Sequence, residues 1–222
     1  MHLLRGALGR GRPERRVPRP SEPGVGDAAP AAVVVVLSRF ALAVFDLDGT
    51  LLDSDAALAA PYVALGVPAS EVTYGHVVAE ECARLGLAVD DYLDRYDVTA
   101  ASPYAGVEEL VAGLRRWAIC SNKVGRCGRA ELERLGWRPD VALFAEDFGG
   151  GPKRVAPALD ALGVDDPASV VFVGDTAHDR AAAAEAGTGF ALAAWNPRAA
   201  TLAEPADLVL ARPIDLLGLL MA

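Results

Sequence analysis

Residues 41–50 read ALAVFDLDGT, and this stretch decides the fold. An apolar run leads directly into Asp46 and Asp48, and Gly49 and Thr50 follow. Short apolar runs bounded by turn residues are typical of strands that are buried on both faces of a parallel sheet. The segment therefore predicts a central strand that delivers two carboxylates to the edge of the sheet at which the strand ends.

Short apolar runs of the same type recur along the chain from residue 39 onward. They alternate with Ala/Leu-rich segments of helical period, which is the pattern of a parallel sheet flanked by helices. We expect an α/β fold with a doubly wound, Rossmann-like parallel sheet. The predicted strands are 41–45, 117–120, 141–144, 170–173, 190–194 and 208–210. The predicted helices are 106–116, 125–135, 154–162 and 178–186, and three of them stop at a glycine of the C′ type (Gly136, Gly163 and Gly187).

Residues 54–102 interrupt this alternation directly after the first strand. The segment contains no convincing strand and is typical of amphipathic helices at 56–65, 70–85 and 89–96. We interpret it as a small inserted helical cap, with a Rossmann-like core formed by residues 39–53 and 103–222. The tyrosines of this segment are expected to anchor the small helices; they are Tyr62, Tyr74, Tyr92 and Tyr96.

The N-terminal residues 1–38 differ in composition from the rest of the chain. They are rich in Arg, Pro and Gly and show no apolar periodicity, so we expect a disordered tail. Residues 1–40 carry seven Arg against three acidic residues, a net charge of +4, which leaves −13 on the remainder. A folded part this acidic repels nucleic-acid phosphates, so a nucleic-acid partner is not expected.

The sequence also bears on the compartment. No apolar stretch approaches the ~20 residues needed to cross a bilayer, and no membrane partner is expected. The three cysteines are too few for a disulfide framework and form no CxxC pair. We therefore expect reduced thiols and a cytoplasmic protein. We also expect the protein to be a monomer or a homodimer.

Polar side chains of catalytic type follow three of the predicted strands. Asp46 and Asp48 follow the first, Ser121 and Asn122 follow the second, and Asp175 follows the fourth, with Asp179 four residues later. In an open parallel sheet the loops at the carboxyl ends of the strands form the ligand crevice, so these side chains are expected to converge.

The residue types indicate phosphoryl chemistry. Two carboxylates at positions i and i+2 of an extended chain lie on one side and repel each other unless a cation neutralises them. Mg²⁺ is a hard cation that takes a few carboxylates and keeps several waters, and Asp175 and Asp179 could supply further negative groups. Lys153 could add a positive charge at the start of a helix. A lysine and a metal beside a carboxylate nucleophile form a suitable receptor for a phosphoryl group.

With these residues in place, the chain resembles the haloacid dehalogenase superfamily, especially its phosphoglycolate-phosphatase-like branch. The resemblance rests on four motifs in order: Asp46-Leu47-Asp48-Gly49-Thr50, Ser121-Asn122, Lys153, and Gly174-Asp175 with Asp179. It extends over about residues 40–220. Lys153 is followed by Arg154, whereas the branch usually has proline there, so either cation is a candidate to face the phosphate.

The resemblance implies a role for each motif. Asp46 would be the nucleophile that forms an aspartyl-phosphate, and Asp48 the general acid that later acts as base. Mg²⁺ would be held by the Asp46 and Asp175 side chains and the Asp48 backbone carbonyl, with Asp179 assisting. Catalytic Lys153 would hold the phosphoryl oxygens of a small phosphorylated substrate, together with the substrate-binding residues Ser121 and Asn122.

Several alternatives stay open at this point. Asp175 and Asp179 could cap a helix, as could Ser121, and Lys153 could be a solvated first-turn lysine. A phosphomutase of the same fold, a dehalogenase and a receiver-like, non-enzymatic phospho-switch are the competing functions. The short cap favours hydrolysis over phosphoryl transfer to a sugar, Asp48 favours phosphoryl chemistry over dehalogenation, and the inserted segment argues against a receiver module.

Overall fold

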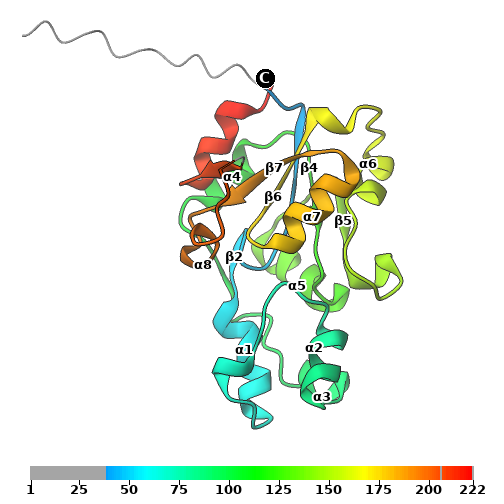
Figure 1. The fold of residues 1–222 in the computed structure, drawn as a ribbon, viewed down its shortest axis with the longest axis vertical. Helices are drawn as coiled ribbons and strands as arrows, with labels where there is room; N and C mark the ends of the chain where they lie inside the picture. Colours follow the sequence, from blue (N-terminus) through cyan, green and yellow to red (C-terminus); the bar gives the residue numbers. More distant parts are fainter. Residues whose placement is uncertain (1–38, 206, 222) are drawn as a thin grey trace, which may run out of the picture. The chain divides into compact units, whose positions relative to one another are not determined.

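The computed structural model describes residues 39–205 and 207–221, so the tail expected at residues 1–38 lies outside the described residues. Its central feature is a six-stranded sheet in the order β5-β4-β1-β6-β7-β8, in which every pairing is parallel (Figure 1). The prediction of a doubly wound parallel sheet is confirmed. The strands are β1 (Leu42–Phe45), β4 (Trp117–Cys120), β5 (Val141–Leu143), β6 (Val170–Gly174), β7 (Gly189–Ala193) and β8 (Leu208–Leu210).

Helices cover both faces of this sheet, and the strand side chains alternate between two hydrophobic clusters. Along β1, Ala43 and Phe45 join one cluster, whereas Leu42 and Val44 join the other. Both faces are therefore dry, which is why the strand reads as a continuous apolar run. The flanking elements are α4 (Val107–Gly113), α5 (Gly125–Leu135), α6 (Ala156–Leu162), α7 (Ala177–Ala186), α8 (Pro197–Ala200) and the 3-10 helices η2 (Ala145–Phe148), η3 (Pro167–Ser169) and η4 (Pro213–Leu219).

The predicted helix ends at glycine are confirmed. Helices α5, α6 and α7 end at Gly136, Gly163 and Gly187, each in the left-handed conformation. Other boundaries shift: α4 ends at Gly113 rather than 116, and α6 begins at Ala156 rather than 154.

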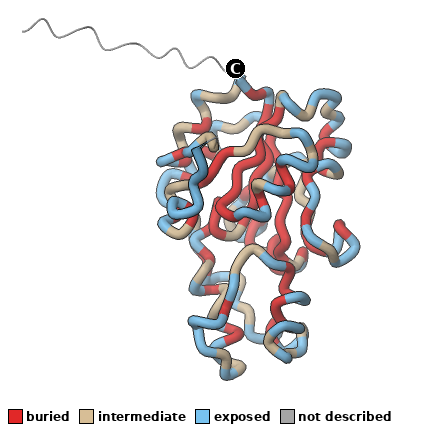
Figure 2. The backbone as a smooth tube through the Cα atoms, viewed as in Figure 1, coloured by how far each residue is buried: buried red, intermediate tan, exposed pale blue. Residues whose placement is uncertain are grey.

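Residues 54–102 contain α1 (Asp55–Ala64), η1 (Ala69–Glu71), α2 (Val78–Leu85) and α3 (Val89–Leu93). They form a group beyond the sheet in Figure 1, and their buried side chains make a hydrophobic cluster of their own, visible as short red stretches in Figure 2. Tyr62 and Tyr92 belong to that cluster. Two short antiparallel strands, β2 (Leu52–Asp53) and β3 (Ser102–Pro103), join the group to the sheet. Two-residue strands leave no pattern in a sequence, so they were not predicted.

The single helix predicted at 70–85 is wrong. The chain makes a 3-10 turn at η1, leaves it, and begins α2 only at Val78. Gly75 lies between them with φ +87°, and its carbonyl accepts a hydrogen bond from Asn122 Nδ2 at 2.8 Å. A contact with the other part of the chain thus replaces the local helical hydrogen bonds.

The cysteines and the lengths of the helices bear on the expected compartment. Cys82, Cys120 and Cys127 are free and buried. Among the residues that the structure describes, no helix combines the length and the apolarity required to cross a bilayer.

Replacing Gly128 with alanine should destabilise the fold. Gly128 lies in α5 against the Phe144 ring, with which an added Cβ would collide. Overpacking costs about 1–3 kcal/mol, more than the ~1 kcal/mol that alanine gains in a helix. Urea unfolding of Gly128→Ala measures this loss. Gly218→Ala is the control, because no atom lies within 4 Å of its added Cβ. Equal stability of the two variants would contradict the tight contact between α5 and Phe144.

Candidate active site

Three neighbouring strands carry the predicted polar side chains to one edge of the sheet. Because β4, β1 and β6 are adjacent, the residues that follow them meet at that edge. They line a cavity of about 50 Å³, closed on the other side by residues of the 54–102 segment. Of the predicted site residues, those lining this cavity are Asp46, Asp48, Ser121, Asn122, Lys153 and Asp175.

Three of the four predicted acids form a buried cluster. One carboxylate oxygen from each of Asp46, Asp175 and Asp179 lies within 4.8 Å of the others. Lys153 Nζ lies 2.9 Å from Asp46 Oδ1 and 2.5 Å from Asp179 Oδ1. Asp175 and Asp179 have no exposed surface and Asp46 is 4% exposed. The cluster is therefore a compact set of hard oxygen donors with one ammonium group beside it.

Burial shifts the protonation of these acids. It raises the pKa of Asp46 to about 6, against the attraction of Lys153. Burial, followed by the charges of Asp179 and Asp46, raises the pKa of Asp175 well above its usual range, and Arg198 offsets only part of this. Both carboxyls thus favour a compensating positive charge.

The donor set fits a divalent cation. Asp46 Oδ1 and Asp179 Oδ1 are buried and accept no hydrogen bond from the described residues, although both are ion-paired with Lys153. Three carboxylates at this spacing are the oxygen ligands that Mg²⁺ prefers. Asp46, Asp175 and Asp179 are therefore the side chains that could hold the metal.

Asp179 serves two structural purposes at once. Thr176 is the N-cap of α7, and Asp179 Oδ2 accepts hydrogen bonds from the backbone N–H groups of Asp175 (3.1 Å) and Thr176 (2.8 Å). The helix-capping alternative thus applies to Asp179, whereas Asp175 is not the cap. The other oxygen of Asp179 still faces Lys153 and the acidic cluster.

Asp48 lies outside this cluster. β1 ends at Phe45, and the chain bends and turns through residues 47–50, so Asp46 and Asp48 do not share one side of an extended strand. Asp48 Oδ1 instead lies 2.8 Å from Lys123 Nζ. The expectation that four acidic side chains meet holds for three, while Asp48 lines the same cavity at a different place.

Lys123 and its buried partner Glu131 were not predicted as site residues. Lys123 Nζ lies 3.1 Å from Glu131 Oε2, and neither side chain is appreciably exposed. Burial lowers the pKa of Lys123, but the charges of Asp48 and Glu131 outweigh it and hold that pKa above its usual value. The available signal was position, since Lys123 directly follows Ser121 and Asn122.

Asp175 has partners that sequence reasoning also missed. Its carboxylate accepts hydrogen bonds from Thr50 Oγ1 (3.1 Å) and Asn196 Nδ2 (3.3 Å), and Arg198 Nη2 lies 2.7 Å from Asp175 Oδ2. Arg198 also pairs with Asp55 at the start of α1, at 3.0 Å. Asn196 and Arg198 lie just after β7, so the strand-end rule could have found them, although no motif marks them.

Asn122 connects the Ser121-Asn122 motif to Lys153. Its Oδ1 accepts a hydrogen bond from the Lys153 backbone N–H at 2.7 Å. Ser121 is buried beside it, with its hydroxyl accepting from the Lys123 backbone N–H at 3.3 Å. Lys153 is buried at the cluster, whereas Arg154 is exposed. Lys153 is thus the cation of this pair that faces the cavity, and it is not a solvated surface lysine.

A comparison with known protein families shows to which family the chain belongs. The family model described as haloacid dehalogenase-like hydrolase matches residues 40–187. The chain belongs to this family. The resemblance noted from the four motifs is therefore confirmed.

Relatives of this hydrolase are phosphatases. It is 29% identical to N-acetylmuramic acid 6-phosphate phosphatase of Pseudomonas aeruginosa, over 82% of this chain and 95% of the relative. It is 31% identical to phosphoglycolate phosphatase of Xanthomonas campestris pv. campestris, over 72% of this chain and 86% of the relative. The expectation of a phosphoric monoester hydrolase is confirmed at this level.

Solved structures share the fold. A haloacid dehalogenase superfamily hydrolase from Geobacter sulfurreducens aligns with a TM-score of 0.58 at 20% identity, covering 82% of this chain and 97% of that one. An inferred phosphoglycolate phosphatase from Lactobacillus plantarum aligns with a TM-score of 0.65 at 24% identity, covering 82% of this chain and 100% of that one. These likenesses concern the fold.

Mg²⁺ affinity should fall as the pH drops through about 6. The pKa of Asp46 is raised to about 6, so below that pH a proton competes with the cation. Each further pH unit should lower the affinity about tenfold for one displaced proton. Calorimetric titration of the hydrolase with Mg²⁺ near pH 5 and near pH 7.5 measures this. Equal affinity at both pH values would contradict binding at the acidic cluster.

Proposed function

We propose that this hydrolase is a Mg²⁺-dependent phosphatase that hydrolyses a small phosphorylated metabolite through an aspartyl-phosphate on Asp46. The observation that carries the proposal is the burial of Asp46 Oδ1 and its contact with a lysine. This oxygen is buried beside a cavity and, among the described residues, has no donor other than the Lys153 ammonium, which lies 2.9 Å away. A carboxylate oxygen in that position is available to attack phosphorus, with a cation nearby to offset the charge of the incoming phosphate.

The two steps divide between Asp46 and Asp48. An Asp46 carboxylate oxygen bonds to phosphorus while the bond from phosphorus to the ester oxygen breaks, and Asp48 donates a proton to that departing oxygen. Asp48 then removes a proton from water, whose oxygen attacks phosphorus, and the Asp46–phosphorus bond breaks to release phosphate. Mg²⁺, when bound, supplies neutralisation of the phosphoryl oxygens.

Lys153 and Ser121 are suited to hold the transferring group. An ammonium group has three N–H donors, and among the described residues Lys153 pairs with two carboxylates, those of Asp46 and Asp179. The third N–H can reach a phosphoryl oxygen. The Ser121 hydroxyl lines the cavity and can donate to another, with the Asn122 backbone beside it.

Residues 54–102 serve as the cap in this proposal, over a core of residues 39–53 and 103–222. The cap contributes Tyr74 and His76 to the wall opposite the acidic cluster. A cavity of about 50 Å³ holds only a few water-sized groups, which favours a compact ester with this cap in place. The substrates of the two relatives, phosphoglycolate and N-acetylmuramic acid 6-phosphate, are the first to test. We place the enzyme in the cytoplasm, as a monomer or a homodimer.

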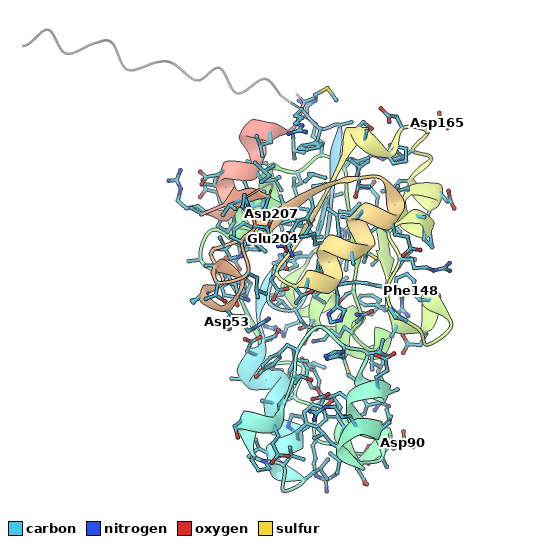
Figure 3. The ribbon with its side chains drawn as sticks, viewed as in Figure 1. Asp53, Asp90, Phe148, Asp165, Glu204 and Asp207 are labelled. Atoms are coloured by element: carbon cyan, nitrogen blue, oxygen red, sulfur yellow. The ribbon has the colours of Figure 1, made fainter. Side chains whose placement is uncertain are left out.

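Asp46→Asn should abolish catalysis. An amide is a poor nucleophile, so kcat for 4-nitrophenyl phosphate with Mg²⁺ should fall at least about 10³-fold, while the fold persists. Asp165→Asn is the matched control: Asp165 is exposed and precedes β6, far from the carboxyl edge of the sheet (Figure 3). Wild-type turnover by Asp46→Asn would exclude Asp46 as the nucleophile.

The lifetime of the acyl-phosphate separates an enzyme from a phospho-switch. An intermediate on Asp46 that decays within about a second supports hydrolysis, because Asp48 is placed at the same cavity to activate water. A lifetime of hours, measured after acid quench, would favour the receiver-like alternative. Release of free phosphate, rather than its transfer to a sugar, excludes the phosphomutase.

A further inference from the structure

The Lys123 ammonium group is held at the centre of a buried polar network. Its Nζ lies 2.8 Å from Asp48 Oδ1, 3.1 Å from Glu131 Oε2 and 2.7 Å from the hydroxyl oxygen of Tyr96. That hydroxyl in turn donates to Glu131 Oε1 at 2.7 Å. Asp48 comes from the turn after β1, Glu131 from α5, and Tyr96 from the proposed cap. Three separate parts of the chain therefore converge on one charge.

This network distinguishes Lys123 from Lys153. Three side chains surround Lys123, and one donor of the ammonium group can point at each of them, so none is left for a phosphoryl oxygen. Lys123 is 5% exposed and Glu131 has no exposed surface. A buried charge with all its donors satisfied fixes its neighbours in place rather than binding a ligand.

We propose that Lys123 is a positioning residue that fixes the carboxyl group of Asp48, which in its protonated form donates the proton to the leaving group, with Glu131 and Tyr96 fixing Lys123 in turn. The inference rests on the proposed function, in which Asp48 is the general acid. A general acid must lie within hydrogen-bond reach of the oxygen that it protonates, so its location controls the rate of ester cleavage.

The geometry explains why Asp48 needs this support. It follows the end of β1 in a turn, and it lies outside the acidic cluster that holds Asp46. Both of its carboxylate oxygens lie close to Lys123 Nζ, at 2.8 and 3.1 Å. Because Tyr96 belongs to the 54–102 segment, the position of Asp48 also depends on that segment being docked against the core.

The test compares two aryl phosphates that differ only in a para-nitro group, 4-nitrophenyl phosphate and phenyl phosphate. 4-Nitrophenolate departs readily without a proton, whereas phenolate is a poorer leaving group and depends more on a general acid. The Lys123→Met/Glu131→Gln double variant removes both charges of the pair, so that no carboxylate is stranded at position 131. We expect kcat/KM with phenyl phosphate to fall about tenfold more than with 4-nitrophenyl phosphate.

Two further variants keep the test decisive. Tyr96→Phe removes one hydroxyl and keeps the ion pairs, and should give a smaller selective loss in the same direction. Asp48→Asn removes the proposed proton donor itself, so it should show the largest difference between the losses of kcat/KM on the two substrates. Adding the double variant to Asp48→Asn should not increase that difference, since both changes act through one proton donor.

The control is Arg84→Met. Arg84 pairs with the buried Glu81 at 2.6 Å within the same segment, and its loss should leave the ratio between the two substrates unchanged. Equal losses on both substrates in the double variant and in Tyr96→Phe would overturn the inference, because a smaller folded fraction lowers both rates alike. Phosphatase activity by the wild type on neither substrate would instead contradict the proposed function itself and remove the basis of the inference.

Discussion

The pairing of buried charges at one edge of the sheet is the constraint on which the rest of the site depends. Taking a carboxylate or an ammonium out of water costs several kcal/mol unless an opposite charge and hydrogen bonds replace the solvent. Three cations here each pair with two carboxylates. The carboxylates are those of Asp46, Asp48, Asp55, Glu131, Asp175 and Asp179, and the cations are Lys123, Lys153 and Arg198. This excess of negative charge is what a divalent cation or bound protons would offset.

The sheet makes such a concentration of charge possible. Strands β4, β1 and β6 are adjacent and dry on both faces, so their ends lie at fixed positions a strand spacing apart. Hydrophobic packing of these strands holds the backbone from which the charged side chains project. The burial of apolar side chains in the sheet thus offsets the unfavourable free energy of bringing like charges together.

The 54–102 segment contacts the site at three separate points. Asp55 pairs with Arg198, which holds Asp175. The carbonyl of Gly75 accepts from Asn122, whose Oδ1 holds the backbone of Lys153. Tyr96 contacts Lys123, the partner of Asp48. Each contact reaches a different site residue, so docking of this segment and the geometry of the site are linked.

The sequence by itself determined the positions of the six strands along the chain, the two-faced burial of the sheet and the residues that follow β1, β4 and β6. Those features are local, because burial imposes apolar runs and the ends of parallel strands share an edge. Only the tertiary structure decided that Asp48 leaves the acidic cluster for Lys123, that Gly75 breaks a predicted helix, and that Arg198 and Glu131 join the site. These choices depend on partners distant in sequence, and an ion pair between such residues has no period or spacing by which a single sequence could reveal it.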